Sequence, residues 1–254
     1  MLLTSTKNPI VQSAKALQTA KGRREQNAFL CDGEHMTGEA LRACPEKVSA
    51  LFVEDGQQER FASLLALAQQ AGSTIYEVSA AVLEAVSQVK TPQGIAAVCG
   101  LPKSCPLERQ GQKLLLMENV QDPGNVGTIL RTLDAAGFDG CILTPGCADP
   151  FAPKTMRATM GSLFRVPMTF VEDGAEAAHW LRTNGWAVIG AELRGQPFYQ
   201  RGNRPDKLCV LIGNEGAGLT EEILAQCSFR YKLPMRGGAE SLNAGIAAAI
   251  MMYD

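Results

Sequence analysis

Hydrophobic and polar positions follow two different spacings along the first 100 residues. Short runs rich in β-branched, aromatic and other apolar residues predict strands, and segments whose apolar residues recur three and four positions apart predict helices. The predicted strands span 28–33, 48–53, 73–78 and 95–99, and the predicted helices span 9–20, 34–43, 61–70 and 80–87. Because strands and helices alternate, this part of the chain is expected to form a small α/β domain.

The same alternation continues after residue 112. The predicted strands lie near 113–117, 141–144, 166–171, 186–191, 208–212 and 229–233, and the predicted helices near 124–136, 153–160, 174–184, 219–226 and 240–253. The strand at 208–212 (LCVLI) is apolar throughout, as expected where helices cover both faces of a parallel sheet. We therefore predict an open α/β sheet, which binds ligands beyond the carboxyl ends of its strands.

Residues 101–112 (LPKSCPLERQGQ) separate the two halves. They contain two prolines among mostly polar and charged residues and stand between two strand-like runs. This composition is typical of a linker. We therefore predict a domain at 1–100, a linker at 101–112 and a second domain at 113–254.

Composition restricts the protein class. Of 254 residues, 46% are hydrophobic and 20% are charged, which are ordinary globular values. The apolar run at 244–253 is about half as long as a membrane span, and residues 1–10 lack a signal-peptide pattern. The eight cysteines form no CxxC pair, and His35 and His179 stand at no metal-ligand spacing to them. We expect a cytoplasmic protein with reduced, mostly buried thiols and no metal site.

The net charge of −2 and the pI of about 5.8 argue against a bulk electrostatic grip on nucleic acid. Residues 1–30 differ from the rest, because they hold five cations and one carboxylate, a local net charge of +4. Such a segment is either a solvated helix face or a basic arm that contacts phosphates, and composition alone leaves both readings open.

Three loops that follow predicted strands carry unusual residues. The first, at 118–137 (ENVQDPGNVGTILRTLDAAG), enters a helix through Pro123 and Gly124, with Asn125 near the helix start and Arg131 farther along. A structural reading is available, in which Asp122 or Asn125 caps the helix and Arg131 is a surface cation.

The second loop, at 211–220 (LIGNEGAGLT), has glycines at 213, 216 and 218 that allow a ligand to approach the backbone closely. A dinucleotide-binding glycine loop follows the first strand of its domain, whereas this loop follows a late one. A simple turn explains the glycines equally well.

The third loop, at 233–254 (LPMRGGAESLNAGIAAAIMMYD), breaks the last strand with Pro234 and two glycines and then opens the final helix. A helix N-terminus offers free amide groups and the positive end of the helix dipole to a ligand. Alternatively, Ser241 is a helix cap.

The three loops, in this order and at these intervals, resemble the three signature motifs of the SpoU (TrmH-like) branch of the SPOUT methyltransferases. Asn125, Gly127 and Arg131 match Asn-x-Gly-x-x-x-Arg, residues 213–216 match Gly-Asn-Glu-Gly, and residues 234–243 match Pro-Met…Ser-Leu-Asn. Similarity extends to 29–36 (FLCDGEHM), 89–98 (VKTPQGIAAV) and 152–168 (APKTMRATMGSLFRVPM). The resemblance thus covers nearly the whole chain.

This resemblance implies an α/β fold in two parts. The N-terminal part would be a ribosomal-protein-like α/β substrate-binding domain. The C-terminal part would be a SPOUT α/β domain with a deep trefoil knot, in which the C-terminal segment is threaded through a loop and the knot walls form the S-adenosylmethionine pocket. Such knots are very rare. Family members are homodimers, and the small residues at 244–249 suit a helix packed tightly in a knot and a dimer interface.

The resemblance also implies an activity, the transfer of a methyl group from S-adenosylmethionine to a ribose 2′-hydroxyl of RNA, with ribosomal RNA favoured over transfer RNA. By motif matching, the cofactor contacts fall to Gly213, Leu233, Met235 and Leu242, and the residues that shape the site are Asn125, Glu215, Ser241 and Asn243.

Arg131 matches the family arginine that acts on the hydroxyl. Because the pKa of arginine exceeds 12, Arg131 is a poor base. It could instead orient a phosphate or stabilise the alkoxide, with Glu215 as its anchor.

RNA contacts are expected from local cations, which are Lys7, Arg23, Arg24, Lys154, Arg157 and Arg165, with Arg194, Arg201 and Arg204 as further candidates.

Three other classes compete with a methyltransferase. A catalytically silent RNA-binding or ribosome-assembly factor on the same fold would not need the intact motif residues. A nucleotide-dependent oxidoreductase would carry GxGxxG after its first strand, and a metalloenzyme would need more than two isolated histidines.

Overall fold

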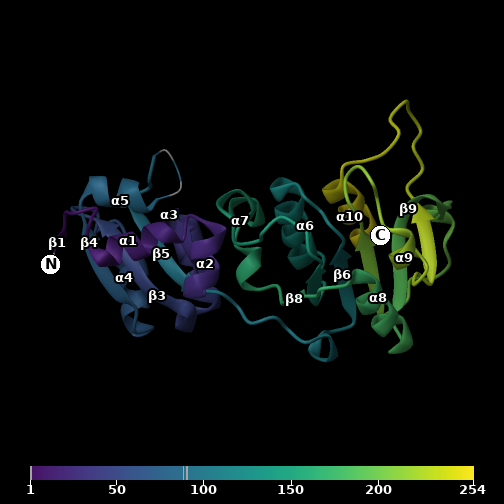
Figure 1. Cartoon of the computed structure of the whole chain (residues 1–254), viewed down its shortest axis with the longest axis horizontal. Coiled ribbons are helices and arrows are strands. Elements are labelled where there is room, and N and C mark those ends of the chain that lie inside the picture. The colour runs from purple at the N-terminus through teal and green to yellow at the C-terminus, as the bar shows by residue number, and fades with distance from the viewer. Residues whose placement is uncertain (1, 88, 90) are drawn as a thin grey trace. The chain divides into compact units, whose positions relative to one another are not determined.

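The computed structural model describes residues 2–87, 89 and 91–254, so Lys90, within the segment 89–98 quoted above, lies outside the described residues. Contacts divide the chain into two compact units (Figure 1). The first comprises Met1–Lys103 with Phe151–Pro153, and the second comprises Ser104–Pro150 with Lys154–Asp254.

The first unit contains a mixed five-stranded sheet in the order β1-β4-β3-β5-β2. Strands β1, β4 and β3 are parallel to one another, whereas β5 runs antiparallel to both β3 and β2. The strands are β1 (Leu2–Leu3), β2 (Ala28–Asp32), β3 (Val48–Glu54), β4 (Thr74–Val78) and β5 (Ile95–Gly100), and the helices are α1 (Pro9–Ala16), α2 (Ala20–Gln26), α3 (Gly33–Ala43), α4 (Ala62–Gln70) and α5 (Ala80–Val86). One apolar cluster of this unit joins α1 and α5 to the sheet around Leu17, Phe52 and Val82.

The helix predicted at 9–20 was wrong in extent, because the structure has two helices there. The Thr19 side chain accepts a hydrogen bond from the Gly22 amide and thereby caps α2. The corner between the helices is tight: a Cβ on Gly22 would lie 2.0 Å from the carbonyl oxygen of Ala16. A local cap and a close backbone contact therefore end the first helix although the hydrophobic pattern continues.

The second unit is built on a six-stranded sheet in the order β11-β9-β10-β6-β7-β8, and every adjacent pair is parallel. The strands are β6 (Lys113–Met117), β7 (Gly140–Leu143), β8 (Met168–Phe170), β9 (Ala187–Pro197), β10 (Leu208–Ile212) and β11 (Phe229–Lys232), and the helices are α6 (Pro123–Ala135), α7 (Pro153–Thr159), α8 (Gly174–Thr183), α9 (Glu221–Leu224) and α10 (Ala244–Tyr253). The predicted open parallel sheet is thus confirmed.

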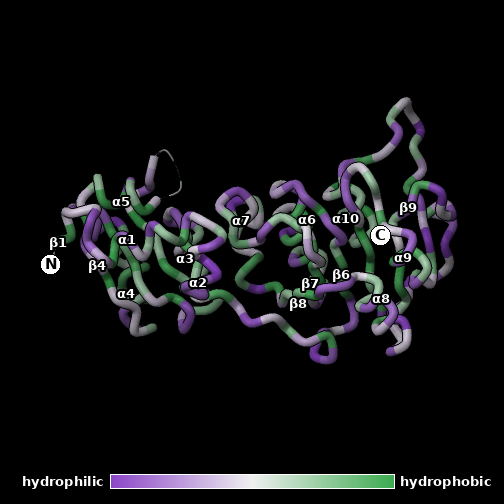
Figure 2. The backbone as a smooth tube through the Cα atoms, viewed as in Figure 1, coloured by the Kyte–Doolittle hydropathy of each residue, from purple (hydrophilic) through white to green (hydrophobic). Residues whose placement is uncertain are grey.

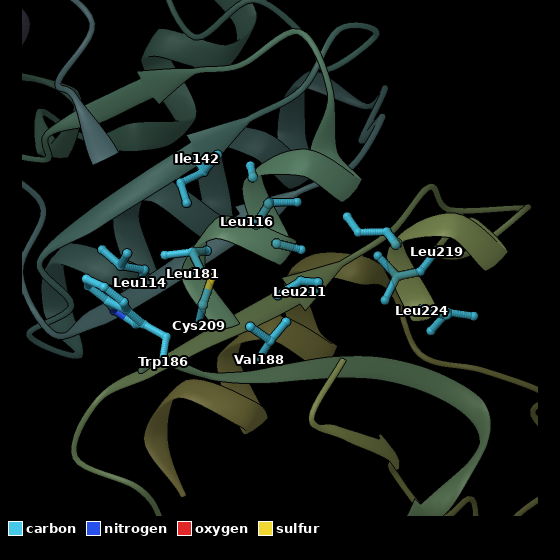
Figure 3. Packing of buried hydrophobic residues seen from close by; sticks show 13 residues of the cluster. Leu114, Leu116, Ile142, Leu181, Trp186, Val188, Cys209, Leu211, Leu219 and Leu224 are labelled. Carbon is cyan, nitrogen blue, oxygen red and sulfur yellow. The ribbon is translucent and has the colours of Figure 1, made fainter. Parts of the chain in front are cut away.

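Helices cover both faces of this sheet. Alternate residues of β6 and β10, such as Leu114 and Cys209, pack against Leu181 of α8 and Leu224 of α9 in the cluster drawn in Figure 3. Helices α6 and α10 pack against each other, and α10 also packs on β10. Leu115 is as fully buried as Leu114, as two covered faces require. Figure 2 shows hydrophobic (green) stretches within this unit, and in sequence β10 is apolar throughout and β6 is apolar after Lys113.

Several boundaries in the second unit differ from the predictions. The last helix begins at 244 rather than 240, because the Asn243 side chain caps it by accepting hydrogen bonds from the amides of Gly245 (2.9 Å) and Ile246 (3.2 Å). Residues 234–243 have no helical structure and form the connection that extends beyond the strand ends in Figure 1. Strand β9 extends to Pro197, well past the predicted end at 191, because its second half pairs with β11 after a register shift.

The predicted linker at 101–112 is attached to the second unit over most of its length. Cys105 donates its amide to Met168 of β8, and the amides of Gln112 and Lys113 bond the Asp139 carboxylate. A short 3₁₀ helix spans Leu107–Arg109. Hydrogen bonds to β8 and to Asp139 therefore hold a segment whose composition predicts a flexible linker.

Two arginines hold the end of α10. Arg204 donates to the carbonyl oxygens of Met252 (2.8 Å) and Asp254 (2.7 Å), and Arg201 pairs with the Asp254 carboxylate. The last carbonyl groups of a helix have no partners within the helix, and cations are favourable there. These contacts fix the C-terminal end of a helix from which Ala244, Ala247 and Met251 line the cavity described below.

All eight cysteines are unpaired, and four are buried. Burial raises the pKa of Cys44 and of Cys227 to about 11 each, so both stay thiols near neutral pH. Over the described part of the chain, no helix is long and apolar enough to span a bilayer, and no group of three or more His, Cys, Asp or Glu side chains is placed to hold a metal ion.

Candidate active site

The three polar loops leave the carboxyl ends of β6, β10 and β11. Since these strands are parallel members of one sheet, their carboxyl ends lie at the same edge. The β6 loop leads into α6, the β10 loop leads into α9, and the β11 loop leads into α10. The fold therefore brings together segments that are up to 118 residues apart in sequence, the separation of Asn125 and Asn243.

A chain of side-chain hydrogen bonds joins the three loops. The Asn125 amide nitrogen donates to Glu215 (2.9 Å), and the Asn243 amide nitrogen donates to the Asn125 oxygen (2.7 Å). The remaining oxygen of Asn243 caps α10. Asn125 is buried, so both ends of its amide are used within the protein. One residue from each motif is thus locked to the next.

The Glu215 carboxylate also accepts hydrogen bonds from the backbone amides of Gln121 (3.2 Å) and Asp122 (3.1 Å). Burial raises the pKa of Glu215, but the hydrogen bonds, foremost that from Asn125, stabilise its carboxylate by more, so its net pKa lies below the usual value. Glu215 is therefore ionised at neutral pH and fixes the start of α6 rather than exchanging protons.

The expected anchoring of Arg131 by Glu215 was wrong. Arg131 lies on α6, its side chain is exposed, and it makes no hydrogen bond or ion pair with any residue in the described ranges. The cap of α6 is Asp122, whose side chain accepts a hydrogen bond from the backbone amide of Asn125 at 2.9 Å. Arg131 is thus available to a ligand, whereas Glu215 is committed to the loops.

The glycine loop after β10 folds back on itself. Asn214 and Gly218 exchange two backbone hydrogen bonds, and the Asn214 side chain accepts the amides of Gly216 and Ala217. The backbone of Gly213 lies very close to the other end of the loop. A Cβ on Gly213 would be 2.2 Å from the carbonyl carbon of Gly218. Gly213 is required by this close approach.

A cavity of about 510 Å³ opens between the second and third loops. This volume is within the range of small-molecule sites. Its walls include all four predicted cofactor residues, Gly213, Leu233, Met235 and Leu242, together with Glu215 and Ser241. Asn125, Arg131 and Asn243 do not line it. The structure therefore gathers the predicted cofactor residues at one cavity, with Asn125 and Asn243 bonded to its wall.

Sequence reasoning missed one wall of this cavity. Ala191, Glu192, Leu193 and Arg194 line it from β9, the strand that pairs with β10. The available signal was their place directly after the apolar run at 186–190, since ligands bind beyond the carboxyl ends of parallel strands.

The predicted RNA-binding cations fall into three groups. Lys7, Arg24 and Arg157 are exposed, and their side chains make no bond within the described part of the chain. Lys154 lies 3.8 Å from Asp122 and stays largely exposed, and Arg165 is paired with Asp134 at 2.8 Å. Arg194, Arg201 and Arg204 are engaged with acidic side chains or the end of α10.

The prediction for Arg23 was wrong. Its side chain is buried, with 5% exposed, and its guanidinium donates to the carbonyl oxygens of Leu17 (3.1 Å) and Gln18 (3.4 Å). These carbonyls stand at the end of α1, so Arg23 stabilises the corner between α1 and α2.

This placement makes Arg23 and Arg24 a matched pair of variants. Arg23→Ala is expected to lower the free energy of unfolding by about 2 kcal/mol, because buried carbonyl groups lose a charged donor. Arg24→Ala is expected to leave stability unchanged and to weaken RNA binding at low salt, because it removes one exposed charge. Chemical denaturation and RNA binding of both variants check this. Equal stability of the two would contradict the structural role of Arg23.

Comparison with known proteins identifies both parts of the chain. Residues 112–253 match the SpoU rRNA Methylase family, and residues 8–97 match the MRM3-like substrate binding domain. A relative from Bacillus subtilis, the 23S rRNA (guanosine(2553)-2′-O)-methyltransferase RlmP, is 37% identical over 257 residues, covering 99% of this chain and 97% of the relative.

Solved structures agree with this similarity. An AdoMet-bound rRNA methyltransferase from Sinorhizobium meliloti aligns with a TM-score of 0.87 and 32% identity, covering 100% of this chain and 96% of that one. The SpoU methyltransferase AviRb from Streptomyces viridochromogenes, in complex with the cofactor AdoMet (S-adenosylmethionine), aligns with a TM-score of 0.83 and 27% identity, covering 97% and 96%. Family match, full-length similarity and motif geometry lead to one conclusion: the chain belongs to the SpoU rRNA methylase family.

Proposed function

We propose that this protein methylates a ribose 2′-hydroxyl of ribosomal RNA with S-adenosylmethionine as the donor. The observation that carries the proposal is the cavity at the strand ends, lined by the second and third motifs and bonded to the first through Asn125. The relative from Bacillus subtilis carries this activity in its name, and two similar structures hold AdoMet.

The residues of the cavity fit this cofactor. The loop from Gly213 to Gly218 lines the cavity and leaves room beside its backbone, and Leu233, Met235 and Leu242 supply apolar surface. Such a wall suits a nucleoside, which needs both flat apolar contact and backbone hydrogen bonds. When bound, S-adenosylmethionine supplies an electrophilic methyl group.

The protein's part in the reaction is to position and stabilise. A guanidinium is a very poor base, so we assign removal of the hydroxyl proton to another group. The free guanidinium of Arg131 instead holds the phosphate beside the ribose or stabilises the oxygen as negative charge develops. Glu215, Asn125 and Asn243 hold the start of α6, and hence Arg131, against the cavity wall. Ser241, exposed on the cavity wall, is placed to contact either substrate.

Substrate selection falls to the first unit in this proposal, with Lys7 and Arg24 as phosphate contacts, joined by Lys154 and Arg157 from α7. Contacts to phosphate position RNA without reading its sequence. The match of residues 8–97 to a substrate binding domain supports this division of labour between 1–100 and 113–254.

Three further features belong to the proposal. We infer a trefoil knot around the last segment, a homodimer and a cytoplasmic location. The packing of α10 between β10 and α6 supports the knot, and the exposure of Ile246 (49%) and Tyr253 (63%) on α10 supports a subunit interface.

The test is transfer of radiolabelled methyl from S-adenosylmethionine to separate ribosomal and transfer RNA pools from cells that lack the protein. Label in the ribosomal pool alone is the expected result. Label in the transfer RNA pool alone would show that the substrate is transfer RNA rather than ribosomal RNA. Binding of RNA with no methyl label in either pool, and none in RNA from ribosome-assembly intermediates, would favour a catalytically silent RNA-binding factor.

A further inference from the structure

The cavity walls carry five charged side chains, which differ in whether they are already paired. Three have partners within the protein. Glu215 bonds the first loop, and Glu192 and Arg194 pair with each other at 3.2 Å. Arg230 also approaches Glu192 at 3.8 Å, and Glu221 bonds Arg194. The charges of these groups are satisfied internally.

The other two are Lys232 and Glu240. Both line the cavity, and neither side chain makes a hydrogen bond or ion pair with any residue that the structure describes. They stand at opposite ends of the third loop, Lys232 at the end of β11 and Glu240 shortly before α10. The cavity therefore presents one unpaired cation and one unpaired anion.

Lys232 is the last residue of β11 and lines the cavity together with its neighbours Tyr231 and Leu233. Glu192, which also lines the cavity, lies 3.8 Å from Arg230 of β11. Lys232 and Glu192 therefore line the same cavity, but the Glu192 carboxylate is already paired with other residues.

S-adenosylmethionine ends in an amino acid, which carries one carboxylate and one ammonium group. We propose that Lys232 binds this carboxylate and Glu240 binds the ammonium group, so that the pair forms the subsite for the amino acid end of the cofactor. The inference rests on the proposed function, because it places the cofactor in this cavity. A cation and an anion that both line the cavity match a zwitterion better than an RNA phosphate, which Glu240 would repel.

The test is calorimetric binding of three ligands to the full chain: S-adenosylmethionine, S-adenosylhomocysteine and 5′-methylthioadenosine. The second lacks the sulfonium charge but keeps the amino acid, and the third lacks the amino acid altogether. The variants are Lys232→Met and Glu240→Gln, which remove charge and keep length. The controls are Arg236→Met and Glu222→Gln, exposed charges outside the cavity wall.

Each variant is expected to raise the Kd of both amino acid ligands about fivefold and to leave that of 5′-methylthioadenosine within about twofold, as for exposed ion pairs. The controls are expected to change neither. Equal weakening of all three ligands would overturn the inference, since the residues would then only shape the cavity. Weakening by Glu240→Gln of S-adenosylmethionine alone would assign Glu240 to the sulfonium and overturn its role here. Failure of the unaltered protein to bind any of the three would instead contradict the cofactor site of the proposed function.

Discussion

Arg131→Ala is expected to lower kcat for methyl transfer by about 10²- to 10³-fold, the usual effect of removing a group that stabilises developing charge. Arg131 is exposed and makes no side-chain bond within the described residues, so its loss should leave folding unchanged. It does not line the cavity, so the Kd of S-adenosylmethionine should also stay the same. Single-turnover kinetics, thermal unfolding and calorimetry separate these effects.

Arg131→Lys is the matched variant, because it keeps the charge and loses the planar fork. We expect it to recover only part of the rate, about tenfold below the unaltered protein, if the guanidinium bonds two oxygens at once. Full recovery would show that charge alone is needed. A rate for Arg131→Ala close to that of the unaltered protein would remove Arg131 from the mechanism.

Gly213→Ala is expected to weaken S-adenosylmethionine binding by about 100-fold or more, because a contact far inside van der Waals distance forces backbone to move. The added Cβ would lie 2.2 Å from the Gly218 carbonyl carbon and 2.3 Å from the Leu219 nitrogen, and both neighbours are backbone atoms. Opening the loop would shift the wall that carries Glu215. Equilibrium binding measures the loss.

Gly237→Ala is the control for this prediction. Gly237 lies in the third loop, outside the cavity wall, and a Cβ there would meet nothing within 4 Å. We expect binding equal to that of the unaltered protein. Equal effects of the two substitutions, or tight binding by Gly213→Ala, would contradict the account of the glycine loop.

The elements that sequence predicts best are those determined by burial. Strands β6 and β10 begin and end at the predicted residues, because buried apolar residues make up all of β10 and all of β6 after Lys113. The ends of the helices depend on single capping contacts instead. Asn243 rather than Ser241 caps α10, and Thr19 starts α2 within one amphipathic stretch.

In the candidate site, too, some features can be predicted from sequence and others cannot. Motif order and the rule for parallel sheets are enough to predict that the three loops lie together. The partners within the site are set by tertiary packing: Glu215 bonds Asn125 rather than Arg131, and the β9 wall has no motif of its own. Charge counts fail for the same reason at Arg23 and Arg24, where adjacent positions on one helix place one cation inside and the other in solvent.

The central claim is that the methyl group goes to a ribose oxygen rather than to a base. Its most direct test is nucleoside mass spectrometry of ribosomal RNA from cells lacking the protein, after incubation with the protein and S-adenosylmethionine. We expect one new 2′-O-methylnucleoside, at an internucleotide linkage that resists alkali, and its absence with Arg131→Ala. A methylated base, or no new methylated nucleoside despite cofactor binding, would contradict it.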